Sequence, residues 1–274
     1  MSSYVHFLFA AMLAAALPVC AQQVQGIDLG YHQMYNLEFD AARKTFAEWI
    51  RQHPNDPLGP VSNAAAHLFS EFDRLHILQS EFFLHDDNFR TTRKLKPDAA
   101  AQQAFQRELA RGRELAGRVL SHSPGDPNAV FAQVLALGLQ SDYDALIEKR
   151  YLSSLNATKE SRQLAEKLLQ SNPQFADAWL AIGVENYLLS LKPLPVRWFL
   201  QWNGNATNKE LGIEKLKITA EKGRFLQPFA RLLLAVAALR DKNRELAGSI
   251  LQSLVHQFPK NHLYAEELAR LRGK

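Results

Sequence analysis

Apolar residues recur along this chain at spacings of three and four, which is the pattern of amphipathic helices. Four Pro residues each follow such a run, with a small residue twelve positions upstream and apolar residues eight and five positions upstream. These offsets place the three upstream sites on one helical face, and each Pro ends its helix because it cannot continue the hydrogen-bond ladder. The four sets are Ala42, Phe46, Trp49 and Pro54; Gly112, Ala116, Val119 and Pro124; Ser161, Ala165, Leu168 and Pro173; and Ala247, Leu251, Leu254 and Pro259.

A fifth set keeps the same face without the proline. It consists of Gly212, Leu216 and Thr219, and Gly223 stands at the turn. The small residue in each set lets a partner helix approach closely, so each helix is expected to be the second member of an antiparallel pair. The turn positions 54, 124, 173, 224 and 259 are separated by 70, 49, 51 and 35 residues. We therefore expect longer helices or inserted loops in the middle copies.

Five helix pairs and a final helix account for this pattern. The predicted pairs are 26–36 with 38–53, 58–85 with 97–122, 127–151 with 157–171, 174–191 with 208–222, and 226–240 with 243–257. A last helix over about 261–272 is expected to cap the stack. Its charged residues suit a polar outer face: Glu266, Glu267, Arg270 and Arg272.

The recurring face resembles the second helix of the tetratricopeptide repeat (TPR) family, which ends on a closing proline. The first helix of that family is matched by Leu29-Gly30 and by Leu234-Ala235 with Ala238. It is also matched by Trp179, Ile182, Gly183 and Tyr187. The resemblance covers most of residues 26–259 and implies an all-α fold, an alpha-alpha superhelix of about five TPR-like antiparallel helix pairs with a C-terminal capping helix. It also implies binding of a protein or peptide.

Composition agrees with a helical, soluble domain. The chain has 274 residues, of which 47% are hydrophobic, with only 13 Gly and 12 Pro. The net charge of +4 is small and no long Lys/Arg block carries it, so nucleic acid is not an expected partner.

The first 21 residues have the features of a signal peptide. The stretch 7–19 is apolar and too short for a membrane anchor, and Ala21 offers a cleavage site. We therefore expect an exported protein, periplasmic or secreted, with residues 22–274 forming one helical-repeat domain. Lipidation at Cys20, the single cysteine, is an alternative that the preceding Val19 disfavours.

In the TPR family the first helices of the pairs line a concave face. The matching positions here are apolar: Ile27, Tyr31, Met34, Leu180, Val184, Tyr187, Leu232, Val236 and Leu239. Tyr31, Met34, Leu180 and Tyr187 are therefore candidate binding residues for an apolar ligand. The alternative is that they form ordinary core or are covered by the protein's own insertions.

The segment 192–207 is the largest predicted insertion and contains the other candidate binding residues, Arg197, Trp198, Phe199 and Trp202. Trp and Arg are enriched at binding hot spots, and aromatic residues beside a cation also suit a membrane surface, so peripheral membrane contact is one option. The favoured interpretation is a plug that places both Trp side chains in the concave face, with its outer edge still reachable by a partner.

Candidate catalytic chemistry is sparse. His67 and Glu71 share a helix face, and His76 and His85 follow, so a metal-dependent enzyme using His67, Glu71 and His85 is one alternative. Their spacing matches no known metal motif, so the sequence predicts no metal, cofactor or catalytic residue. The expected function is a non-catalytic protein or peptide interaction module. The first alternative is a carrier or chaperone for an apolar ligand or an outer-membrane segment, and the metal-dependent enzyme is the second.

Overall fold

The computed structural model describes residues 25–78, 95–190 and 208–273. Within these ranges the protein is all-helical and contains no strand. The helices are α1 (Gly26–Tyr35), α2 (Phe39–Gln52), α3 (Leu58–Arg74), α6 (Ala99–His122), α7 (Pro127–Leu146), α8 (Tyr151–Ser171), α9 (Trp179–Ser190), α11 (Lys209–Lys222), α12 (Gln227–Arg240), α13 (Arg244–Gln257) and α14 (His262–Gly273). A short 3-10 helix, η1 (Ala176–Ala178), leads into α9.

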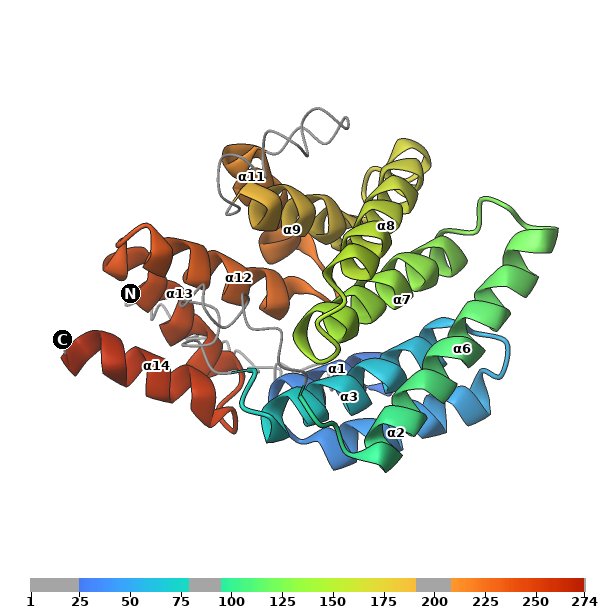
Figure 1. Ribbon diagram of the computed structural model, residues 1–274, viewed down its shortest axis with the longest axis horizontal. Helices are drawn as coiled ribbons and strands as arrows, with labels where there is room; N and C mark the ends of the chain where they lie inside the picture. Colours follow the sequence, from blue (N-terminus) through green and yellow to red (C-terminus); the bar gives the residue numbers. More distant parts are fainter. Residues whose placement is uncertain (1–24, 79–94, 191–207, 274) are drawn as a thin grey trace, which may run out of the picture.

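Helices that follow one another in the sequence pack against one another, as the repeated pattern predicts (Figure 1). The four prolines mark helix ends correctly: α2, α6, α8 and α13 each stop two residues before Pro54, Pro124, Pro173 and Pro259. Four helices begin after a polar residue whose side chain accepts a hydrogen bond from the third residue of the helix. These N-caps are Asp98, Asp126, Asn208 and Asn243.

Predicted helix bounds are wrong in the second and third pairs. The helix expected over 58–85 ends at Arg74, because His76 adopts a left-handed conformation with φ of 57° and Ile77 closes the end by donating to Phe72 O. The helix expected over 127–151 ends at Leu146, and Lys149 has φ of 58°. The next helix, α8, consequently starts at Tyr151 rather than at 157.

In three of the five repeated sets the small residue lies where two helices touch, as predicted. A Cβ on Gly212 of α11 would stand 2.6 Å from the backbone nitrogen of Tyr187 in α9. A Cβ on Gly112 of α6 would stand 2.3 Å from Val61 Cγ2 in α3. Ser161 of α8 donates a 3.0 Å hydrogen bond to Val134 O in α7. Ala42 and Ala247 are fully buried.

The helix pairs follow a curved path that brings the last helices back to the first (Figure 1). The largest hydrophobic cluster runs from Ile27 in α1 to Leu226 before α12, and two smaller clusters lie around Tyr187 and around Phe258. None of the helices that the structure describes has the length and apolar character that crossing a bilayer requires.

Candidate apolar binding site

The site forms where the N-terminal helix pair meets the C-terminal helices, a contact region that we call the seam. Asp28 of α1 accepts two hydrogen bonds from Arg224 in the turn before α12, at 2.8 and 2.7 Å. Tyr35 donates its phenolic hydrogen to Phe225 O at 2.9 Å, and its own carbonyl accepts from Asn261 Nδ2 at 2.8 Å. Polar contacts therefore join residues that are about 200 positions apart in the sequence.

A second pair of contacts closes the seam at the start of α14. Lys260 donates its backbone N–H to Asn36 Oδ1 at 3.1 Å, and its ammonium group lies 2.6 Å from Glu38 Oε1. These residues belong to the turn between α1 and α2 and to the turn between α13 and α14. The N-terminal helix pair is thus joined to the C-terminal helices at two places: at Arg224 before α12 and at Lys260 before α14.

Aromatic rings fill the middle of the seam. The ring of Phe225 lies 4.9 Å from that of Tyr31 and 6.2 Å from that of Phe131, measured between centroids. Tyr31 also contacts Phe46 edge to face at 5.5 Å, and its hydroxyl accepts a hydrogen bond from Ser62. Burial raises the pKa of the Tyr31 phenol well above its ordinary value. The cluster is a packed core that connects α1 with α7 and α12.

Asp177 in η1 fixes the turn that carries Phe225. Its Oδ1 accepts from the backbone N–H groups of Phe225 and Leu226 at 3.1 and 2.8 Å, and its Oδ2 accepts from that of Arg224 at 2.9 Å. Burial raises the pKa of this carboxyl, and the three N–H groups act in the opposite direction. Asp177 thereby satisfies backbone donors at the start of α12 from another helix pair.

Beside this core the seam contains an apolar pocket, which we call the seam pocket. Phe69 of α3 and Phe229 of α12 meet on its wall, edge to face with centroids 6.0 Å apart. The other apolar lining residues include Met34, Leu37 and Phe39 from the first helix pair, Leu78 after α3, Leu232, Val236 and Leu239 from α12, and Leu263 and Tyr264 from α14. Both sides of the seam therefore contribute walls to one cavity of about 60 Å³.

The polar lining of the seam pocket lies at its α14 side. Glu267 and Arg270 line it there and form an ion pair at 3.2 Å. The side chain of Asn261 already makes two hydrogen bonds: its Nδ2 donates to Tyr35 O, and its Oδ1 accepts from the backbone N–H of Leu263. The expectation that Glu267 faces outward on a terminal cap is wrong, because α14 packs this side of the helix against the seam and buries Glu267.

The candidate binding residues that the structure describes occupy different places. Met34 lines the seam pocket together with Leu232, Val236 and Leu239, which come from the same set of predicted concave positions. Tyr31 lies in the aromatic core, and Leu180 packs between two hydrophobic clusters. The structure does not bring Tyr187 to the seam pocket. Arg197, Trp198, Phe199 and Trp202 lie outside the described residues.

Tyr187 belongs to a separate small cluster with Leu216, Leu233 and Ala237. Its side chain is almost fully buried, and its hydroxyl has no hydrogen-bond partner among the described residues. Burial raises the pKa of this phenol to about 12. Its role in the described structure is to pack α9 against α11 and α12.

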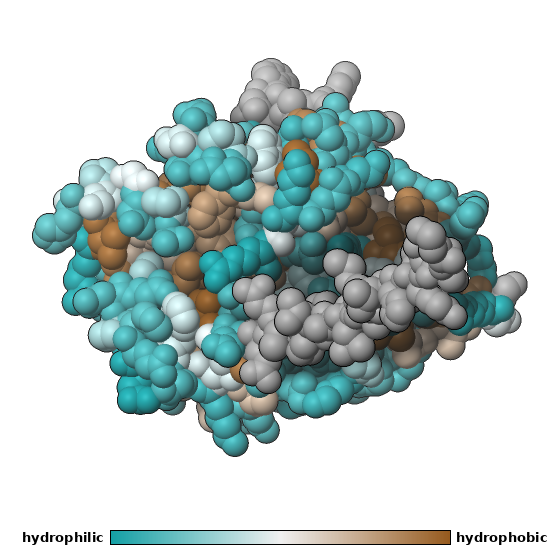
Figure 2. Space-filling view, turned by 180° about the vertical axis from the view of Figure 1, so that it is seen from behind, coloured by the Kyte–Doolittle hydropathy of each residue, from teal (hydrophilic) through white to brown (hydrophobic). Residues whose placement is uncertain are grey.

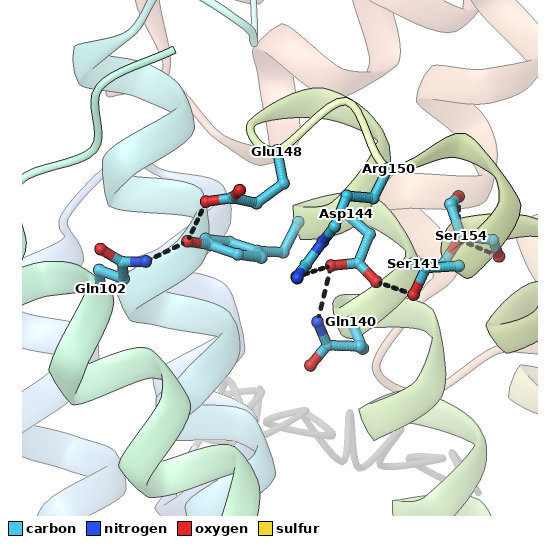
Figure 3. A network of polar contacts seen from close by, with 9 residues as sticks. Gln102, Gln140, Ser141, Asp144, Glu148, Arg150 and Ser154 are labelled. Carbon is cyan, nitrogen blue, oxygen red and sulfur yellow. Dashed lines mark hydrogen bonds and ion pairs between the residues drawn. The ribbon is translucent and has the colours of Figure 1, made fainter. Parts of the chain in front are cut away.

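A network of polar contacts lies at the turn between α7 and α8 (Figure 3). Asp144, which is buried, accepts from Arg150 at 2.6 Å, from Gln140 at 3.0 Å and from Ser153 at 2.5 Å. Tyr143 accepts from Gln102 of α6 and donates to Glu148. These bonds occupy the Asp144 carboxylate and tie the turn to α6, so the cluster supports the fold.

The residues considered for a metal site are engaged in other contacts. Glu71 is buried, pairs with Arg74 at 2.6 Å and accepts from the backbone N–H of Asp98 at 2.7 Å, joining the end of α3 to the start of α6. Burial, with Arg43 and Arg107 nearby, lowers the pKa of the His67 imidazole to about 4. His85 lies outside the described residues. Among those that are described, no three His, Asp or Glu side chains are grouped as metal ligands.

The outer surface shows apolar residues in several separate areas between polar helices, seen from behind in Figure 2. The sequence matches no protein-family model and no curated protein. The repeated helix pairs and the seam pocket are therefore the features of the protein that bear on its function.

Proposed function

We propose that this chain is an exported, non-catalytic helical-repeat module, similar in architecture to TPR proteins, that binds a protein or peptide partner. The repeated face of the second helices supports the likeness to TPR proteins, since its small residue lies at a helix contact in three copies and is fully buried in the other two. The signal-like segment 1–21 supports export.

One observation carries the proposed binding role. Met34, Leu232, Val236 and Leu239, which belong to the expected concave positions of the first and last pairs, line one apolar pocket in the structure. Apolar pockets with a few polar groups at one side are typical binding sites. The seam pocket is therefore the proposed place where a partner inserts an apolar group.

The proposal is tested by affinity purification from the native cell envelope. Leu232 and Leu239 line the pocket and are only partly buried, so Leu232→Glu and Leu239→Glu place a charge there with limited damage to the core. Leu246→Glu is the matched control, because Leu246 is 47% exposed on α13 and does not line the pocket. We expect the two pocket variants to lose a co-purifying protein that the control retains. A partner retained by all three variants, at unchanged melting temperature, would place binding elsewhere.

A further inference from the structure

We infer that the seam pocket accepts a single branched aliphatic side chain, of valine, leucine or isoleucine size, from a polypeptide partner. This inference rests on the proposed function and names the group that the pocket recognises. It follows from the size of the cavity, from its lining and from the charges at its polar side.

Size separates the possible apolar ligands. The cavity volume is about 60 Å³. A single water needs roughly 10–15 Å³, whereas an engineered cavity of about 150 Å³ binds benzene. The seam pocket lies between these limits, so at its present size it is too small to enclose a lipid tail or an indole ring. An apolar group of three or four carbon atoms is larger than water and smaller than benzene, so it is the occupant that matches this volume.

The lining favours an apolar group over water. The side chains of Phe69, Phe229, Leu232 and Val236 present only carbon atoms, so water away from the α14 side of the pocket has few hydrogen-bond partners. Because the walls come from α1 and α3 on one side and from α12 and α14 on the other, an inserted side chain contacts both ends of the stack. Its binding therefore also reinforces the seam.

Charge at the polar side favours a peptide over a fatty acid. Arg270 is paired with the buried Glu267, so the two groups together carry no net charge. A carboxylate head group approaching Arg270 also meets the carboxylate of Glu267, which repels it. A peptide group, which has both a donor and an acceptor, matches the pair without adding charge.

The test uses methyl NMR of the full-length chain labelled at methionine. Met34 is the methionine in the described part of the chain and lines the pocket, so its ε-methyl reports on occupancy; Met34→Leu assigns the signal. The probes are N-acetyl amino-acid methylamides of Ala, Val, Leu and Phe, and octanoate. We expect a saturable shift with the Leu probe. We also expect the Ala probe to bind about 10- to 100-fold more weakly, since each buried methylene is worth about fourfold in affinity.

Variants locate the response. Leu232→Phe narrows the pocket and is expected to abolish the Leu-probe shift, whereas Leu246→Phe on the surface of α13 is expected to leave it unchanged. If Leu232→Phe fails to fold, Val236→Leu provides a smaller filling change with the same expected loss. Equal binding of the Ala and Leu probes, tighter binding of octanoate, or no shift of the Met34 methyl would overturn the inference.

The outcome separates this inference from the proposed function. If the Leu probe does not bind but Leu232→Glu still loses a captured partner, the pocket belongs to a binding surface and takes a different group. If the Leu probe binds and no captured partner depends on Leu232, the pocket recognises aliphatic groups and the proposed partner-binding role fails.

Discussion

Asp28 and Arg224 form a two-point ion pair between residues 196 positions apart, with Nε 2.8 Å from Oδ1 and Nη2 2.7 Å from Oδ2. The Arg224 side chain is 63% exposed, so solvent and salt screen the pair. The aromatic ring of the next residue, Phe225, is buried between Tyr31 and Phe131. The pair marks the seam, and the buried ring supplies most of its stability.

The first prediction compares these two contributions. We expect Asp28→Asn to lower the free energy of unfolding by about 1 kcal/mol or less, with an effect that shrinks at high salt. We expect Phe225→Ala to lower it by about 3–5 kcal/mol, as is usual for a large buried aromatic. Urea denaturation at two salt concentrations measures both. Equal losses for the two variants would show that the seam is held by charge.

The second prediction concerns Asp177. Replacing it with Ala leaves the backbone N–H groups of Arg224, Phe225 and Leu226 without their acceptor, two of them in a buried turn. We expect a loss of about 2–4 kcal/mol and faster hydrogen exchange at Phe225 and Leu226. Asp126→Ala is the control: it removes an ordinary cap at the start of α7 and should cost about 1 kcal/mol. Unchanged exchange at Phe225 would contradict the proposed role of Asp177.

The third prediction uses two glycines on the same helix, α6. A Cβ at position 112 meets Val61 of α3 at 2.3 Å and Pro57 O at 3.3 Å, so Gly112→Ala should overpack this contact and cost about 1–3 kcal/mol. Apart from the chain neighbours and the backbone of α6 itself, no described atom lies within 4 Å of a Cβ at position 117, so Gly117→Ala should stabilise the helix by about 0.5–1 kcal/mol. Thermal melts of the two variants should therefore move in opposite directions. A stabilised Gly112→Ala protein would show that α3 and α6 are less closely packed than described.

The fourth prediction concerns pH. Burial raises the pKa of the Asp142 carboxyl from 3.8 to about 7, and no described residue donates a hydrogen bond to it. The folded protein therefore binds this proton more tightly than the unfolded chain does. The resulting stability is complete below about pH 3.8 and is lost as the pH rises to about 7. Asp142→Asn should accordingly be more stable than the parent at pH 8, by on the order of 1–4 kcal/mol, and similar to it near pH 4.

Two comparisons isolate the Asp142 effect. His67 changes stability in the opposite direction, because its lowered pKa makes the folded protein more stable as the pH rises from about 4 to 6.5. His67 is present in both proteins, so its contribution cancels in the difference. Asp144→Asn on the same helix should lower stability at pH 8, since it breaks the pair with Arg150. Parallel pH profiles for the parent and Asp142→Asn would disprove the assignment.

The sequence was sufficient to place the helix pairs because each depends on local rules. A proline after an apolar run ends a helix, as Pro54 does after α2. A glycine permits a close contact with the neighbouring helix, as Gly212 does with α9. The end of α3 was missed because the left-handed residue there is His76, whereas glycine is the residue that usually signals such a turn.

The seam could not be predicted in the same way. Asp28 and Arg224 look like ordinary surface charges, and nothing in their local sequence indicates that they meet. Asp177 resembles any acidic residue at the start of a helix until the turn at Phe225 is known to lie beside it. The sequence predicts Met34 and Val236 as apolar positions on helix faces, but their convergence on one pocket depends on the accumulated curvature of the whole stack.

Contact between the first and last helices has a consequence for how the chain folds. In an open repeat array each unit interacts with its neighbours alone, so unfolding can begin at either end and proceed stepwise. Here α1 cannot fray without exposing Phe225 and opening the region beside α14. Such long-range contacts also require closure of a loop of about 200 residues before they form, which slows folding and favours a single cooperative transition.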